Sequence, residues 1–166
     1  VTFEHINING INKQCDFVEL DHLCRTLTNM EAGIYSVNEH KLDTTKHHIR
    51  DRMREVMQRV DRHAKYVFAS NEDSTSEHGW KPGGTMIGLS GKWASRWRGQ
   101  GKDRMGRWSW IDIKGKGKKM IRVISAYCVS QSSVRGVGPL TSCQQQFNSL
   151  VKSRATILNP KKAFAK

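Results

Sequence analysis

The apolar residues of this chain change their spacing once, near Gly83-Gly84. Before that point, strand-like segments alternate with helix-like ones. After it, short alternating segments follow one another with Gly-Lys pairs between them. A helix repeats every 3.6 residues and a strand every two, so the change predicts strand-helix-strand-helix-strand and then an antiparallel meander. This order describes an α/β sandwich rather than a doubly wound sheet.

The boundaries of these elements follow from turn and cap residues. Asp16-Phe17-Val18-Glu19 has the spacing of a capping box and predicts the start of the first helix. The second helix starts near Thr45, and Thr141 or Ser142 caps a later one. The apolar stripes are Phe17, Leu20, Leu23/Cys24 and Leu27, and then Ile49, Met53, Val56, Met57 and Val60. Strands are expected over 1–8, 34–37, 65–70, 85–90, 93–98, 107–114 and 119–127, and residues 161–166 suit a helical turn.

Charge is the outstanding bulk property. The 166 residues hold 28 Lys+Arg against 15 Asp+Glu, a formal net charge of +13. Such a balance indicates a polyanionic partner, most often nucleic acid, although a merely basic surface is the alternative. The four cysteines have no framework spacing, which predicts reduced thiols in an intracellular, not a secreted, protein. No apolar run is long enough for a membrane span, so no membrane partner is expected.

Polar residues follow two of the expected strands. Asn7 ends the first strand, and Glu39 follows the second. The ends of neighbouring parallel strands meet at one sheet edge, where ligand sites of α/β sheets collect. A Glu39 carboxylate there suits Mg²⁺, which prefers oxygen ligands. On spacing alone, a turn asparagine and a solvent-facing glutamate remain the alternative.

Residues 92–122 interleave cations with tryptophans. Cations neutralise phosphates and indoles stack on bases, so this stretch is a second candidate site. The candidate nucleic-acid-binding residues are Arg96, Arg98, Lys102, Arg104, Lys116, Lys118 and Lys119. Trp108 and Trp110, two apart on one strand, are expected to be core residues instead. Residues 115–118 suit an exposed hairpin tip.

Five segments in this order and spacing resemble one family. They are Asn7-Ile8-Asn9-Gly10, Asn38-Glu39-His40, Gly83-Gly84, Gly106-Arg107-Trp108 and Ile124-Ser125-Ala126-Tyr127. The chain resembles the endonuclease/exonuclease/phosphatase superfamily, and most of all the endonuclease domain of non-LTR (LINE-type) retroelements. The resemblance implies a DNase I-like four-layer α/β sandwich and a hydrolase that cuts DNA with Mg²⁺ or Mn²⁺.

The resemblance also implies roles for single residues. Glu39 would bind the metal, Asn7 would help to form the metal site, and Tyr127 would place its hydroxyl near the scissile phosphate. A reverse transcriptase region of the same polyprotein would be a partner, and the nucleus the compartment.

Two parts of the family's pattern are not found in this sequence. They are a Gly-Asp-x-Asn segment, which activates or positions the attacking water, and a closing Asp-His pair. We therefore expect residues 1–166 to be the N-terminal portion of one domain, incomplete and inactive alone, with an apolar sheet face left open. A non-enzymatic nucleic-acid-binding remnant is the main alternative function. A phosphatase of small phosphoesters is a third.

Overall fold

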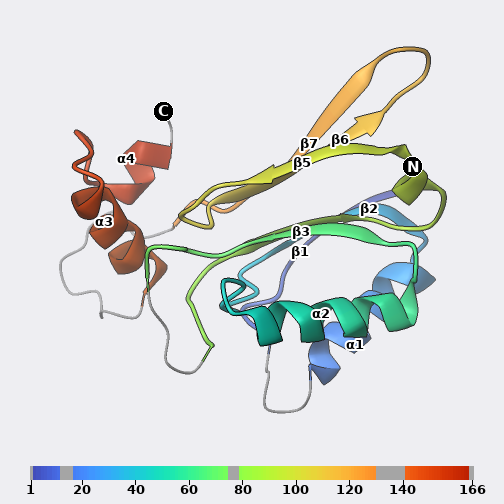
Figure 1. Cartoon of the computed structure of the whole chain (residues 1–166), viewed down its shortest axis with the longest axis horizontal. Coiled ribbons are helices and arrows are strands. Elements are labelled where there is room, and N and C mark those ends of the chain that lie inside the picture. The colour runs from blue at the N-terminus through green and yellow to red at the C-terminus, as the bar shows by residue number, and fades with distance from the viewer. Residues whose placement is uncertain (1, 12–16, 75–78, 130–140, 165–166) are drawn as a thin grey trace.

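Two stacked β-sheets, with helices on the outer face of the first, make up most of the chain (Figure 1). The computed structural model describes residues 2–11, 17–74, 79–129 and 141–164. The elements are β1 (Thr2–Asn7), α1 (Val18–Asn29), β2 (Ala32–Asn38), α2 (His47–Val60), β3 (Lys65–Ala69), β4 (Thr85–Leu89), the 3₁₀ helix η1 (Gly91–Arg96), β5 (Trp97–Lys102), β6 (Trp108–Lys114), β7 (Met120–Ala126), α3 (Ser142–Lys152) and α4 (Pro160–Phe164). No helix of the described residues is long and apolar enough to cross a bilayer.

The first sheet has the order β1-β2-β4-β3, and the second has the order β5-β6-β7. β1 and β2 run parallel, with Asn7 paired to Asn38. The ends of both strands therefore lie at one edge, as the sequence predicts. β4 runs antiparallel to β2 and β3, and the second sheet is a fully antiparallel meander. The mixed α/β architecture with two sheets confirms the expected fold class.

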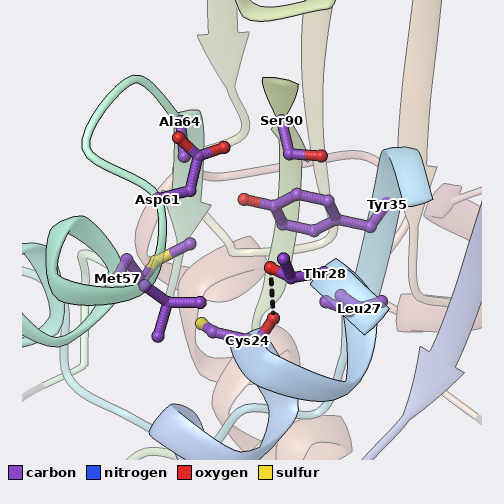
Figure 2. Close-up of a pocket in the computed structure, with 9 residues that line it drawn as sticks. Cys24, Leu27, Thr28, Tyr35, Met57, Asp61, Ala64 and Ser90 are labelled. Carbon is purple, nitrogen blue, oxygen red and sulfur yellow. Dashed lines mark hydrogen bonds between the residues drawn. The ribbon is translucent and has the colours of Figure 1, made fainter. Parts of the chain in front are cut away.

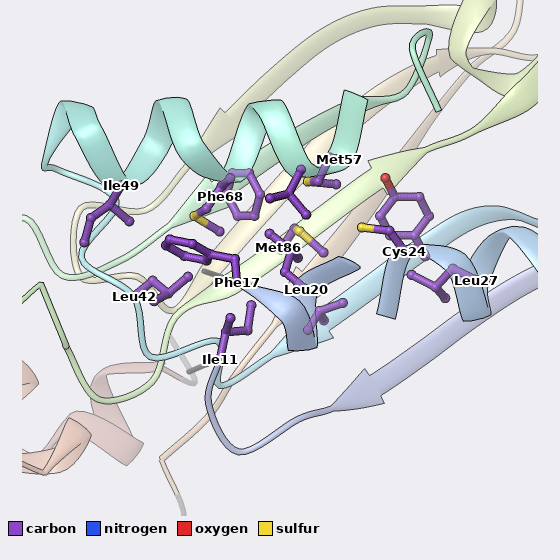
Figure 3. Packing of buried hydrophobic residues seen from close by; sticks show 14 of the residues in the cluster. Ile11, Phe17, Leu20, Cys24, Leu27, Leu42, Ile49, Met57, Phe68 and Met86 are labelled. Carbon is purple, nitrogen blue, oxygen red and sulfur yellow. The ribbon is translucent and has the colours of Figure 1, made fainter. Parts of the chain in front are cut away.

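The first hydrophobic core lies between α1, α2 and the first sheet (Figure 3). Leu20, Cys24 and Leu27 of α1 are buried there, and so are Ile49, Met53, Val56 and Met57 of α2. Both predicted helical stripes are thus confirmed. Phe68 and Met86 contribute the sheet side of this core. A second core fills the space between the sheets and contains Ile34, Ile87, Leu89, Ile111 and Ile113.

The strand expected over residues 93–98 is wrong. Residues 91–96 form η1, and β5 begins at Trp97 and continues through Gly99 and Gly101, where turns were expected. Two close contacts of tryptophans explain the difference. The Trp93 indole lies so close to Gly33 that a Cβ there would be 2.4 Å from Cδ1, and Trp110 covers Gly101 in the same way at 2.5 Å. Glycine therefore serves a packing role in β2 and β5 rather than a turn role.

The expectation that Trp108 and Trp110 are core residues is also wrong. The buried face of β6 carries Ser109, Ile111 and Ile113, so these tryptophans lie on the outer face and are half-buried. Each is covered by an arginine instead. The Arg107 guanidinium lies 4.3 Å from the Trp108 ring centroid, and that of Arg122 lies 3.9 Å from the Trp110 ring. The cations satisfy the ring faces by cation–π contact.

One of the two predicted helix caps is present in the structure and the other is not. Thr141 caps α3, where its side chain accepts a hydrogen bond from the Gln144 amide. The capping box expected at Asp16 is not the cap of α1, because the helix begins after Phe17, which has φ 60° and provides no side-chain cap. Asp16 itself lies outside the described residues. Phe17 is buried in the first core, and this burial holds the unusual backbone.

The polar segment 71–82, expected to be a surface loop, is buried at both ends. Asn71 is 3% exposed and Lys81 is 1% exposed. The Lys81 ammonium lies 2.9 Å from Asp43 Oδ1 and donates to the Asn71 carbonyl at 2.6 Å. A buried lysine is tolerated only when it is paired in this way. Lys81 therefore joins this segment to the loop that follows β2.

Candidate active site

Glu39 and Asn7 lie side by side where β2 and β1 end. Asn7 Nδ2 donates to Glu39 Oε1 at 3.3 Å. Asn7 Oδ1 accepts the backbone N–H of Asn9 at 3.1 Å. Both ends of the Asn7 amide are therefore engaged, and the side chain acts to orient the carboxylate. The predicted convergence of these two residues is present in the structure.

Left-handed backbone is concentrated around this carboxylate. Asn9, Glu39 and Lys41 have φ values of 51°, 58° and 56°. The conformation of the last two is fixed by the two glycines that precede β4, because Glu39 N donates to Gly84 O at 2.8 Å and Lys41 N donates to Gly83 O at 2.9 Å. Non-glycine residues with positive φ cost free energy and cluster at functional sites. The Lys41 ammonium also donates to Asn9 Oδ1, which joins the turn after Glu39 to the turn after Asn7.

A line of buried side-chain hydrogen bonds joins β2 to β7. Ser36 Oγ donates to Ser125 Oγ at 2.7 Å, and Ser125 Oγ donates to Asn38 Oδ1 at 3.1 Å. Asn38 Nδ2 then donates to the Ala126 carbonyl at 2.9 Å. We call Ser36, Asn38 and Ser125 the polar seam. It fixes the end of β7, and hence Tyr127, against the end of β2.

Tyr127 completes the cluster from the second sheet. Its hydroxyl lies close to Glu39 and Ser142, and both side chains affect its pKa. Burial, together with the charge of Glu39 and the hydrogen bond to it, raises the pKa of Tyr127 to about 12, against a smaller lowering by Ser142. The phenol is therefore protonated at neutral pH and acts as a hydrogen-bond donor. The structure thus brings Asn7, Glu39 and Tyr127, the three predicted site residues, together.

His40 lies directly behind the site and is fully buried. Its Nε2 donates to the Ala69 carbonyl at 3.0 Å, and its Nδ1 accepts the Leu42 N–H at 3.1 Å. Burial lowers the pKa of His40 to about 4, although hydrogen bonds to the backbone at Ala69 and Thr85 oppose this. The imidazole is therefore neutral and holds the turn that presents Glu39.

The donor atoms of this cluster fit a hard divalent cation. Glu39 offers a partly exposed carboxylate that two neighbours orient, and Mg²⁺ is commonly held by one or two carboxylates with water completing its shell. Within residues 2–11, 17–74, 79–129 and 141–164, no three His, Cys, Asp or Glu side chains gather as a metal cluster. Among these residues, Glu39 is the carboxylate that would hold such an ion.

The predicted nucleic-acid-binding cations fall into two groups. Lys102 lies 2.7 Å from Glu72, and Arg104 lies 2.9 Å from Asp73, so both are paired with carboxylates. The other group, Arg96, Arg98, Lys116, Lys118 and Lys119, is exposed and forms no ion pair with a described residue.

A small cavity lies elsewhere, between α1, α2 and the first half of β2 (Figure 2). Its wall is mostly apolar, with Cys24, Leu27 and Met57, and the Tyr35 hydroxyl points into it. Burial raises the pKa of Tyr35 well above its usual value. The cavity volume of about 20 Å³ has room for about one water molecule. It is therefore too small to be a substrate site.

Sequence reasoning missed the residues that assemble this cluster. Lys41 follows Glu39 by two positions, and no sequence pattern marks its return toward Asn9. The polar seam was missed because polar residues in β2 and β7 carry no sign of pairing across 87 to 89 positions. A polar residue at an inward strand position, as at Ser36, was the available signal.

Comparison with known proteins identifies the fold. No protein-family model and no curated protein sequence matches the chain. An endonuclease/exonuclease/phosphatase family protein from Leptotrichia buccalis C-1013-b aligns with 93% of this chain at TM-score 0.50 and 11% identity. A 3'-5' exonuclease (NExo) from Neisseria meningitidis aligns with 92% at TM-score 0.51 and 19% identity. The chain spans 63% and 50% of the lengths of these two proteins, whose fold it shares.

Proposed function

We propose that this chain carries the metal-binding side of a phosphodiesterase site that cuts DNA, in a nuclease of the endonuclease/exonuclease/phosphatase superfamily. The observation that carries the proposal is the carboxylate of Glu39, which accepts a hydrogen bond from Asn7 of the first sheet and lies close to the Tyr127 hydroxyl, which follows the last strand of the second. The shared fold with two proteins of nuclease or phosphatase name adds support.

Each residue of the cluster has a task in this proposal. Glu39 would hold Mg²⁺ or Mn²⁺, and Asn7 would keep the carboxylate in place. A bound divalent cation polarises a phosphoryl oxygen and lowers the pKa of water. Tyr127, protonated at neutral pH, would donate a hydrogen bond to a phosphate oxygen. The Lys41 ammonium, which donates to Asn9, would add positive charge at the same edge of the sheet.

Three further features support DNA and a retroelement source. The net charge of +13 favours a polyanion over a small phosphoester. One protein of the same fold is a 3'-5' exonuclease. The motif spacing resembles LINE-type endonuclease domains. We therefore propose a retroelement DNA endonuclease that acts in the nucleus beside a reverse transcriptase region of the same polyprotein.

Metal binding tests the proposal directly. We expect Mn²⁺ to bind the chain, followed by electron paramagnetic resonance, and Mg²⁺ to compete. Glu39→Gln should weaken Mn²⁺ binding strongly, and Asn7→Ala should weaken it by about tenfold, the effect of removing a group that orients a ligand. Glu31→Gln is the matched control, because Glu31 precedes the same strand and also has positive φ, 53°. Equal loss in Glu31→Gln, or no loss in Glu39→Gln, contradicts the proposal.

Cleavage is a separate test. Phosphodiester hydrolysis needs a metal, an oriented water and protonation or charge relief of the leaving oxygen. Because residues 1–166 are proposed to be the N-terminal portion of the domain, we expect little nicking of supercoiled plasmid by this chain with Mg²⁺. Nicking as fast as that of complete nucleases of this superfamily, abolished by Glu39→Gln, would show that the chain is sufficient.

The alternative of a non-enzymatic DNA-binding protein is favoured by one observation, the group of exposed cations without ion pairs among the described residues. Binding of DNA that survives EDTA and falls steeply with salt would support it. Loss of all DNA binding in EDTA would favour the metal site instead.

A further inference from the structure

The cations of residues 92–122 separate into a paired set and an unpaired set. Arg107 pairs with Asp103 and Arg122 with Asp112, as Lys102 and Arg104 pair with Glu72 and Asp73. Seven exposed cations form no ion pair with a described residue: Lys92, Arg96, Arg98, Lys114, Lys116, Lys118 and Lys119. We call these seven the distal basic surface.

The seven residues come from η1, from Arg98 in the adjoining β5, and from the β6–β7 hairpin, and these elements meet. η1 carries Lys92 and Arg96, and the Arg96 guanidinium reaches the Lys114 carbonyl at 3.5 Å, where the β6–β7 hairpin begins its turn. Arg96 also lies 4.8 Å from the Trp93 ring centroid, which holds it against the protein surface. The cations of η1 and of the hairpin therefore form one surface.

This surface lies far from the candidate active site. β7 runs from Met120, beside the hairpin tip, to Ala126, and Tyr127 follows. Seven residues of extended strand span about 23 Å. In Figure 1 the β6–β7 hairpin extends beyond the rest of the second sheet, at the end away from α3 and α4. The distal basic surface is therefore too far away to contact a phosphate bound at Glu39.

The shape of the hairpin selects among polyanions. It is a two-stranded ribbon whose tip, around Gly117, carries lysines with no acidic neighbour paired to them. The major groove of B-form DNA admits such a ribbon, whereas the deep, narrow major groove of A-form RNA does not. Lysine ammonium groups contact phosphates without reading sequence. A distance of about 23 Å corresponds to about seven base pairs.

We propose that the distal basic surface is a second contact for duplex DNA, with the β6–β7 hairpin in the major groove. It binds independently of metal and of base sequence. A duplex of more than about seven base pairs is long enough to span this surface and Glu39, and the contact would then hold the DNA while the candidate active site engages a phosphate. The proposal extends the proposed function but does not require Glu39 to bind metal.

The test measures binding of a fluorescein-labelled duplex of about 20 base pairs in EDTA, by anisotropy, over about 50 to 200 mM KCl. The variant is Lys116→Glu/Lys118→Glu/Lys119→Glu. Its affinity should fall by at least about tenfold, and the slope of log K against log salt should become less steep by about two to three, since each lost phosphate contact removes about 0.9. Circular dichroism and thermal unfolding should match the parent, because all three side chains are exposed.

The matched control is Lys152→Glu/Lys161→Glu/Lys162→Glu, with the same change of charge on exposed residues of α3 and α4. It should retain most of the affinity and the salt slope. Equal losses in both triple variants, or none in the hairpin variant, overturn the proposal. So does competition by poly-glutamate as effective as that by unlabelled duplex, which would indicate an acidic protein partner.

Glu39→Gln separates the two proposals. It should abolish Mn²⁺ binding and leave anisotropy in EDTA unchanged. If Mn²⁺ does not bind at Glu39, the proposal of the distal contact is unaffected. If the hairpin variant binds DNA normally, the proposal of the metal site is unaffected.

Discussion

A single buried imidazole supports the candidate active site from behind. His40 donates to the Ala69 carbonyl and accepts the Leu42 N–H, and its ring lies edge-on to Phe68 with centroids 6.0 Å apart. Protonation of Nδ1 would place a second N–H against that of Leu42. The folded protein therefore requires neutral His40, whereas the unfolded chain does not.

This requirement predicts acid sensitivity. His40 has a folded pKa of about 4 against 6.5 for the unfolded residue. Between these two pH values the unfolded state binds more protons than the folded state. The contribution of neutral His40 to the free energy of unfolding is therefore complete above pH 6.5 and is lost as the pH falls toward 4. The loss amounts to about 3 kcal/mol. Urea unfolding at several pH values measures it.

A pair of histidine variants checks this assignment. The pH dependence should largely disappear in His40→Gln and persist in His48→Gln, since His48 is exposed on α2. A parent protein equally stable at pH 7 and pH 5 would contradict the buried neutral histidine.

The sequence predicts which residues carry the chemical groups of the site better than it predicts the residues that hold those groups in position. Asn7 and Glu39 are predictable because a parallel pair of strands brings their ends together. The position of Tyr127 depends on a contact between sheets, which residue spacing alone does not encode. Lys41 depends on a left-handed turn stabilised by Gly83 and Gly84, far along the chain.

Among the elements, β7 is held in position relative to the site by side-chain hydrogen bonds. The polar seam connects it to β2 through hydroxyl and amide groups that are nearly inaccessible to water. Ser125 both accepts from Ser36 and donates to Asn38, so its removal takes the hydrogen-bond donor from the buried Asn38 Oδ1 and leaves the Ser36 hydroxyl with His5 as its remaining partner.

We therefore expect Ser125→Ala to lower the free energy of unfolding by about 1 to 3 kcal/mol, the cost of buried groups left unsatisfied. Tyr127 fluorescence and NMR shifts should change as well, because β7 loses its attachment beside Glu39. Ser95→Ala is the control, since the Ser95 hydroxyl bonds only its own turn at an exposed position. Equal effects of the two substitutions would rule out a special role for the polar seam.

Element types follow the sequence closely in the first half and less closely after Gly84. The helices are predicted because a one-sided apolar stripe must be buried. The 3₁₀ helix η1 is missed because Trp93 and Trp97 are large aromatic residues, which are enriched in strands. Its backbone is decided instead by the Trp93 ring, which needs the space above Gly33.

For the whole molecule, the two faces of the second sheet differ. Its inner face packs on the first sheet, whereas its outer face carries Met120 and Ile124, which are 53% and 54% exposed. α4 contacts this face at Phe164, whose ring lies 6.1 Å from that of Trp108. Apolar side chains gathered on an outer sheet face favour self-association.

We expect this face to bind a hydrophobic dye such as anilinonaphthalene sulfonate in the native state. Met120→Thr/Ile124→Thr should reduce dye fluorescence and precipitation on concentration. Val18→Thr/Met30→Thr, at exposed apolar positions of α1, should change them little. A monomer that does not raise the fluorescence of the dye and that unfolds in one cooperative thermal transition would contradict the expectation.

The polar seam also limits which positions of such a protein can accept substitutions and insertions. Apolar side chains between two sheets allow one sheet to shift along the other, because apolar contacts are not directional and one methyl group can replace another as a packing partner. Directional donors and acceptors do not, since a shift of two residues along β7 would separate every partner. Loops around the site can therefore accept insertions over generations while Asn7, Glu39 and Tyr127 keep their mutual alignment. In a saturation mutagenesis library, the least substitutable polar positions outside the site should then be Ser36, Asn38 and Ser125.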